Sequence, residues 1–112
     1  PAALSAFGSS SLAANDLTFF AAPVVPNQAG IIFSGVSIAQ VPFFGRTLCV
    51  STPLVRSPLL PTGPTGVIVW QYDNSEPMAM PGTTRYFQTF YRDPTDPVGL
   101  NLSNAYRVTF TQ

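Results

Sequence analysis

The sequence TTRYFQTFYR at residues 83–92 decides the fold class, because it reads as a long β-strand in a chain without helical patterning. Successive side chains of an extended chain point to opposite faces. Aromatic residues of this segment fall on both faces: Tyr86, Phe87, Phe90 and Tyr91. Since aromatic residues are enriched in strands, we expect the longest strand of the protein here, with large apolar side chains on either side.

Shorter apolar runs on both sides of this segment predict the remaining strands. The predicted strands are residues 17–21, 30–36, 46–52, 67–72 and 105–111, with a possible short edge strand at 54–56. The apolar residues 41–45 are expected to form a loop. Twelve prolines and eight glycines interrupt every window that could form a helix, since proline ends or kinks helices. The pattern predicts an all-β fold: a single antiparallel β-sandwich of about seven strands, Ig-like or jelly-roll-like.

Alternation within two of these strands indicates which side chains face the core. In residues 17–21, the residues Leu17, Phe19 and Ala21 share one face, and in residues 105–111 the apolar Tyr106, Val108 and Phe110 alternate with polar residues. Residues at i, i+2 and i+4 of a strand line one face. We expect these two faces to point inward, where nine phenylalanines, four tyrosines and one tryptophan supply the core.

Composition excludes several classes of function. The chain has 112 residues, a net charge of +0, five arginines and neither lysine nor histidine. Nucleic acid is an unexpected partner, because such binding relies on excess positive charge. The commonest general base and the commonest zinc ligand are both absent without histidine. No apolar run approaches the roughly 20 residues of a transmembrane helix, so we expect no transmembrane segment.

The low charge favours a protein that associates with neighbours or carries sugar. Only 9% of the residues are charged, against about 25% in a usual soluble domain. A neutral surface with few charges is poorly protected against association. Serine and threonine supply much of the polarity, a composition common in extracellular proteins.

Residues 1–14 are interpreted as an N-terminal arm, ahead of a β-sandwich domain at 15–112. The arm is small and apolar, followed by Gly8 and a run of serines. It could pack on its own sandwich as an extra strand, or on a neighbour by strand addition. The predicted assembly residues are Ala2, Ala3, Leu4, Ala6 and Phe7.

Other candidate sites are isolated. Asp93, Asp96 and Asn101 are weak candidates for a calcium site, since calcium takes several oxygen ligands, although aspartate before proline commonly organises a turn. Asn101 also begins an Asn-Leu-Ser triplet, a possible glycosylation site. The single cysteine, Cys49, is either a buried small apolar residue or half of an intermolecular disulfide. A sugar-stacking platform could be built from four aromatic residues: Trp70, Tyr72, Tyr86 and Tyr91.

Four phrases of the sequence together resemble a known family. They occur at residues 26–33, 41–50, 86–94 and 100–105. In this order and spacing they resemble a β-rich C-terminal module of secreted or surface proteins of planctomycete-type bacteria, over about Leu4 to Phe110. Members often carry a second cysteine that can pair with the one matching Cys49, and this chain lacks it. The resemblance implies a secreted β-sandwich and implies no activity.

We expect a non-catalytic extracellular or cell-surface structural protein, and not an enzyme. It would be a subunit or module of a fibre, sheath or other self-assembling structure, a homo-oligomer or filament without a cofactor. The alternative is an extracellular carbohydrate-binding module, possibly with calcium. An enzyme is disfavoured because only carboxylates are available and no motif places them together. These carboxylates are Asp16, Asp73, Glu76, Asp93 and Asp96.

Overall fold

The computed structural model of the chain describes residues 3–11, 13–14, 16–35, 37–43, 46–50, 55–72, 80–94 and 99–112, and gives the backbone alone for 39–43 and 46–49. Within these ranges the regular elements are all strands, and none is a helix. The eleven strands are β1 (Ala3–Phe7), β2 (Thr18–Ala22), β3 (Ala29–Gly35), β4 (Ile38–Phe43), β5 (Arg46–Val50), β6 (Val55–Arg56), β7 (Leu60–Pro61), β8 (Ile68–Gln71), β9 (Thr84–Arg92), β10 (Leu100–Leu102) and β11 (Tyr106–Thr109).

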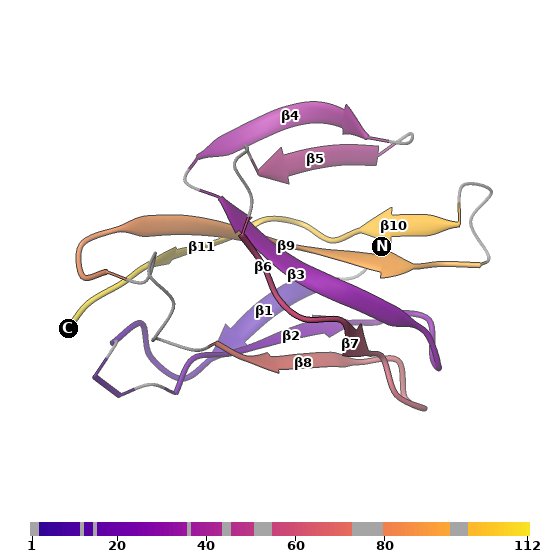
Figure 1. Ribbon diagram of the computed structural model, residues 1–112, viewed down its shortest axis with the longest axis horizontal. Coiled ribbons are helices and arrows are strands. Elements are labelled where there is room, and N and C mark those ends of the chain that lie inside the picture. Colours follow the sequence, from indigo (N-terminus) through magenta and orange to yellow (C-terminus); the bar gives the residue numbers. More distant parts are fainter. Residues whose placement is uncertain are drawn as a thin grey trace.

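The strands form two packed sheets and a separate hairpin. The small sheet has the order β1-β2-β8, and the large sheet has the order β10-β9-β3-β6, with β11 also paired to β9 and β7 also paired to β3. Every pairing between named strands is antiparallel. Figure 1 shows the β4–β5 hairpin, the large sheet and the small sheet as successive layers. The predicted all-β, antiparallel, sandwich-like fold is therefore confirmed.

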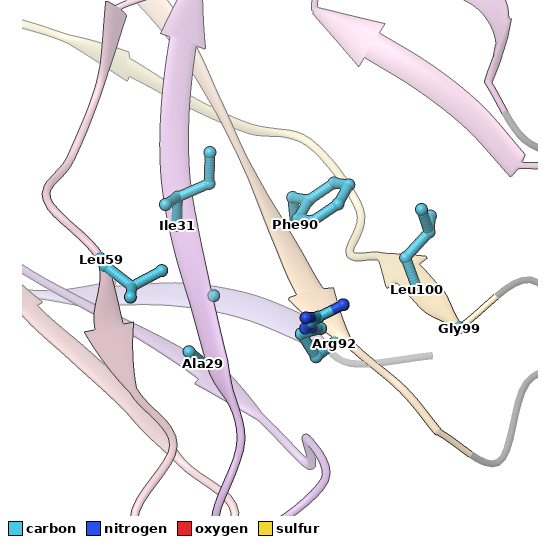
Figure 2. A pocket seen from close by; sticks show the side chains of 8 residues that line it. Ala29, Ile31, Leu59, Phe90, Arg92, Gly99 and Leu100 are labelled. Carbon is cyan, nitrogen blue, oxygen red and sulfur yellow. The ribbon is translucent and has the colours of Figure 1, made fainter.

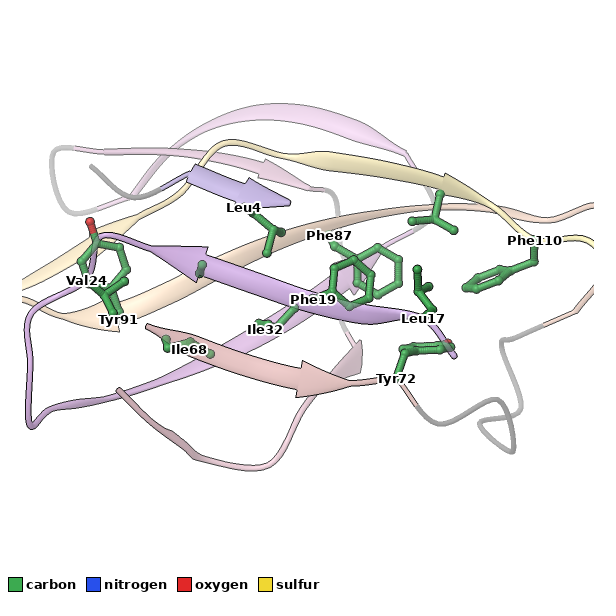
Figure 3. Packing of buried hydrophobic residues seen from close by; sticks show 12 residues of the cluster. Leu4, Leu17, Phe19, Val24, Ile32, Ile68, Tyr72, Phe87, Tyr91 and Phe110 are labelled. Carbon is green, nitrogen blue, oxygen red and sulfur yellow. The ribbon is translucent and has the colours of Figure 1, made fainter. Parts of the chain in front are cut away.

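The main core lies between the two sheets (Figure 3). Phe19 of β2 is at its centre, with its ring centroid 4.4 Å from that of Phe87 on β9 and 6.0 Å from that of Trp70. Leu17 and Ala21 are buried beside Phe19, and Val108 and Phe110 are buried on the facing sheet. The predicted inward faces of residues 17–21 and 105–111 are thus confirmed, because alternation along each strand sends one set of side chains to the core.

Strand β9 carries apolar side chains on both faces, as predicted. Phe87 and Tyr91 face the small sheet. Tyr86 and Phe90 point the other way and pack against a second cluster, formed by Phe33, Val50 and Leu102. Val50 belongs to the β4–β5 hairpin, so this second cluster attaches the hairpin to the outer face of the large sheet.

Several strands were not predicted. Residues 41–43 were predicted as a loop and instead complete β4, which includes Pro42. Proline is tolerated in an edge strand, where no neighbour needs its missing N–H, and β4 pairs only with β5 among the described residues. The predicted count of about seven strands is too low, since β4, β7 and β10 add to it, and β1 was predicted only as one of two arrangements of the arm.

The predicted arm contributes a strand to this structure. Residues Ala3–Phe7 form β1 and pair with β2 of the same chain, with Leu4 opposite Ala21. Leu4 is 3% exposed and belongs to the main core. Of the two arrangements considered for this segment, the structure has the strand on its own sandwich.

Candidate functional site

The outer face of the small sheet presents side chains without charge. We call it the uncharged face. Its outward residues alternate with buried ones along the three strands, and they are Ala3, Ser5, Phe7, Thr18, Phe20, Ala22, Val69 and Gln71. The register aligns Ser5, Phe20 and Val69 in one row across the sheet. Within these three strands no arginine, aspartate or glutamate interrupts the face.

Two large apolar side chains are exposed on this face. Phe7 is 67% exposed and Val69 is 51% exposed. The Phe7 ring leans on Phe20, with their centroids 4.7 Å apart and the planes inclined at 58°. Contiguous exposed apolar side chains on a soluble protein usually indicate a binding surface. Because the face carries no charge, its burial would leave no ion without solvation.

A second apolar surface is a groove on the outer face of the large sheet (Figure 2). The β4–β5 hairpin packs on part of this face through Val50. The same face holds a groove of about 440 Å³, lined among others by Ala29, Ile31, Leu59, Phe90, Arg92 and Leu100. We call it the apolar groove. A volume of this size is within the range of about 300–1,000 Å³ that ligand clefts occupy.

Hydrogen bonds hold the walls of the apolar groove. The Ser57 N–H donates to the Ile32 carbonyl over 2.7 Å, and the Ile32 N–H donates to Ser57 Oγ over 3.0 Å. This double contact fixes the chain beside β3 just before Leu59, which is 74% exposed. On the other wall, the Asp93 N–H donates to the Gly99 carbonyl over 3.0 Å. Hydrogen bonds to the backbone therefore fix the chain on both sides of the apolar groove.

Arg92 supplies the only charge among the described groove-lining residues. It ends β9 with its side chain exposed. An arginine at the margin of an apolar groove can bind an anion or the face of an aromatic ring.

A smaller hollow contains two of the predicted calcium ligands. Asp93 and Asn101 line a cavity of about 410 Å³ together with Tyr91 and prolines 23 and 26. The Asn101 Nδ2 atom donates to Asp93 Oδ2 over 3.5 Å, while Asn101 Oδ1 accepts the Leu102 N–H over 2.9 Å. Asp96, the third candidate, is outside the described residues.

This geometry offers a cation few oxygen atoms. Calcium binds six to eight oxygens, whereas Asn101 turns its nitrogen to Asp93 and uses its oxygen on the backbone. Within the described ranges no group of three or more His, Cys, Asp or Glu side chains could hold a metal ion. Calcium binding remains a prediction that depends on additional ligands.

The glycosylation and disulfide candidates have different surroundings. Asn101 is 9% exposed in β10, so its amide nitrogen would have to leave Asp93 before a sugar could be attached. Cys49 lies in β5, and its side chain is outside the described part of the structure. Glycan attachment and an intermolecular disulfide both remain predictions.

The predicted assembly residues divide between two faces. Leu4 and Ala6 point into the main core, whereas Ala3 and Phe7 point to solvent on the uncharged face; Ala2 lies outside the described residues. Sequence reasoning treated the segment as one apolar arm. Alternation along residues 3–7 groups Ala3, Ser5 and Phe7 on one face, but it does not identify the buried face, because both faces carry apolar residues.

The aromatic residues considered for sugar stacking do not share an exposed face. Tyr72 and Tyr91 are buried in the main core, and Trp70 packs against it. Tyr86 lies on the opposite side of the large sheet, against the second cluster. The platform interpretation of these four residues is therefore wrong, and they stabilise the two cores.

Comparisons with protein-family models, with curated proteins and with solved structures found no match to this chain. Among the described residues, no helix is long and apolar enough to cross a membrane. The fold is an antiparallel, sandwich-like all-β structure, and apolar side chains are exposed on the outer face of each sheet.

Proposed function

We propose that this chain is a non-catalytic structural module that associates with other copies of itself through the uncharged face. The exposure of Phe7 on a sheet face free of charge is the observation that carries the proposal. Removing apolar surface from water contributes roughly 25 cal/mol per Å², and the strands β1, β2 and β8 themselves carry no charged group whose desolvation would oppose that gain.

Strand order adds to this support. The described part of the small sheet ends at β1 on one side and at β8 on the other. Neither strand carries an outward charge, the usual protection of an edge against pairing with another chain. A subunit of a fibre, a sheath or another extracellular surface structure fits such a sheet. The proposed extracellular location is supported by the family resemblance and by the hydroxyl-rich composition.

The experiment is the oligomeric state as a function of concentration. Sedimentation velocity of the wild-type chain should show association as concentration rises, and Phe7→Ser should weaken it at least tenfold. Ile38→Ser is the matched control, because Ile38 is equally apolar and 62% exposed but lies on the β4–β5 hairpin. Monomers at every concentration, or equal weakening by both variants, would reject the proposal.

A second function has one specific observation in its favour. The hollow that holds Asp93 and Asn101 combines polar side chains with a proline-rich wall, and sugar hydroxyls bind polar groups beside apolar surface. As the alternative, we propose carbohydrate binding at this hollow, with calcium as a possible requirement. A glycan array with and without chelator tests it. No bound glycan, and no thermal shift on adding calcium, would count against it.

A further inference from the structure

We propose that copies of this chain associate head to tail, with Phe7 and Phe20 of one copy entering the apolar groove of the next. This inference rests on the proposed function, since it names the second surface that self-association would use. The occupant of the groove is thus a second copy of the chain.

The positions of the two surfaces make such a contact self-propagating. The two sheets lie in separate layers (Figure 1). The uncharged face is the outer side of the small sheet, and the apolar groove is on the outer side of the large sheet. The main core separates them. A contact between two different surfaces of one molecule is heterologous, and it produces an open filament unless the rotation between copies closes a ring. Each copy in a stack would use both of its faces.

The apolar groups that remain exposed in one copy match each other. Phe7 and Leu59 are 67% and 74% exposed, and they lie on the two different surfaces. Ile31 and Phe90 form the floor of the groove and are half-buried. Inserting Phe7 would cover all of these groups in a single contact. Aromatic anchors that fill a pocket are the residues that most often dominate the energy of an interface.

The aromatic rings of the uncharged face also suit the cation of the groove. Arg92 is a cation at the groove, and the face of an aromatic ring carries negative potential. The uncharged face brings two aromatic rings, Phe7 and Phe20, within contact of each other. It brings no arginine that would repel Arg92. If the uncharged face instead bound a second uncharged face, Arg92 and the groove would remain open to water.

Two variants and their mixture test the inference. Phe7→Ser removes the inserted ring, and Leu59→Glu places a charge in the groove. Both positions are exposed, so circular dichroism and thermal unfolding should match the wild type. Each variant alone should be monomeric at concentrations where the wild type forms large assemblies. A 1:1 mixture should form dimers and nothing larger, because the groove of the first variant receives Phe7 of the second.

The outcomes separate this inference from the proposed function. If the wild type stays monomeric, the proposed function fails. If Phe7→Ser abolishes association while Leu59→Glu leaves it intact, the uncharged face pairs with itself, and the head-to-tail contact is rejected while the proposed function stands. Two monomeric variants that give no mixed dimer also reject it. In support, Arg92→Gln should weaken association by about two- to fivefold, the size of an exposed cation–π contact.

Discussion

The backbone N–H of Leu4 donates a hydrogen bond of 2.8 Å to the side-chain oxygen of Asn104, a residue 100 positions later in the chain. This bond joins the outer edge of β1 to the chain segment between β10 and β11. An unpaired N–H at a sheet edge is a template for another strand. Because the Leu4 N–H already donates to Asn104, it is not available for pairing β1 with a strand of a neighbour.

Replacing Asn104 should loosen β1. Asn104→Ala leaves the Leu4 N–H without this acceptor, so the free energy of unfolding should fall by about 1 kcal/mol. The Leu4 amide should exchange its hydrogen faster than in the wild type. Urea unfolding and amide exchange by NMR measure the two effects. Asn104→Asp keeps an acceptor oxygen and is the control, with slow exchange at Leu4. Unchanged exchange in Asn104→Ala would show that another group protects this amide.

Ser34 and Arg85 should be energetically coupled. Arg85 is 2% exposed, and its Nε and Nη2 atoms both donate to Ser34 Oγ, over 3.1 and 3.0 Å. Guanidinium stays charged when buried, so Ser34→Ala should cost about 2–3 kcal/mol. The double variant with Arg85→Met should lose less than the sum of the single variants, because it no longer buries a charge. Urea unfolding of all four proteins gives the coupling, and strict additivity would contradict it.

Two of the strands that sequence reasoning found were recognised by alternation along their own residues. Residues 17–21 and 105–111 show this, since a period of two requires no knowledge of the neighbouring strand. By contrast, two of the five residues of β1 are alanines, Ala3 and Ala6, and alanine is depleted in strands. Residues 3–7 form a strand because all five of them pair with residues of β2. The pairing depends on two segments that are separated in the sequence, so residues 3–7 alone do not reveal it.

The apolar groove was beyond sequence reasoning for a related reason. Whether Ile31 and Phe90 are core or surface depends on how far the β4–β5 hairpin extends over the large sheet, and no local pattern states this. The pairing of Ile31 with Phe90 across β3 and β9 places them side by side. The burial of Arg85 was equally hidden, because an arginine in a strand is ordinarily read as a solvent-facing residue.

Gly30 should not tolerate a side chain. A Cβ atom added there would lie 2.6 Å from the Phe90 carbonyl oxygen and 2.9 Å from Ile68 Cδ1. The backbone oxygen belongs to the central pairing of β3 with β9 and cannot move without disturbing it. Gly30→Ala should therefore cost about 1–3 kcal/mol, measured by urea unfolding. Ile68→Val removes the contact with Cδ1 only. If it fully rescued Gly30→Ala, the Phe90 oxygen would not be the obstacle.

Asp16 should make the β1–β2 connection sensitive to acid. Its Oδ1 atom accepts hydrogen bonds from the Ser9 N–H over 3.0 Å and from Ser9 Oγ over 3.1 Å. These bonds, the backbone one first, lower the pKa of the Asp16 carboxyl below its ordinary value. A carboxyl with a lowered pKa in the folded state stabilises that state above its unfolded pKa of about 4. The contribution is lost as pH falls through the lowered pKa.

Asp16→Ala should therefore be less stable than the wild type at pH 7, and the difference should shrink to nothing in strong acid. Urea unfolding at pH 7, 4 and 2 follows the difference, and an NMR titration of the carboxyl carbon gives the pKa itself. Ser9→Ala is the control, because it removes the hydrogen bond from the hydroxyl and keeps the one from the backbone. The pKa of Asp16 in this variant should therefore rise only part of the way to its ordinary value. A stability difference that is constant down to pH 2 would mean that Asp16 acts through the shape of the loop and not through its charge.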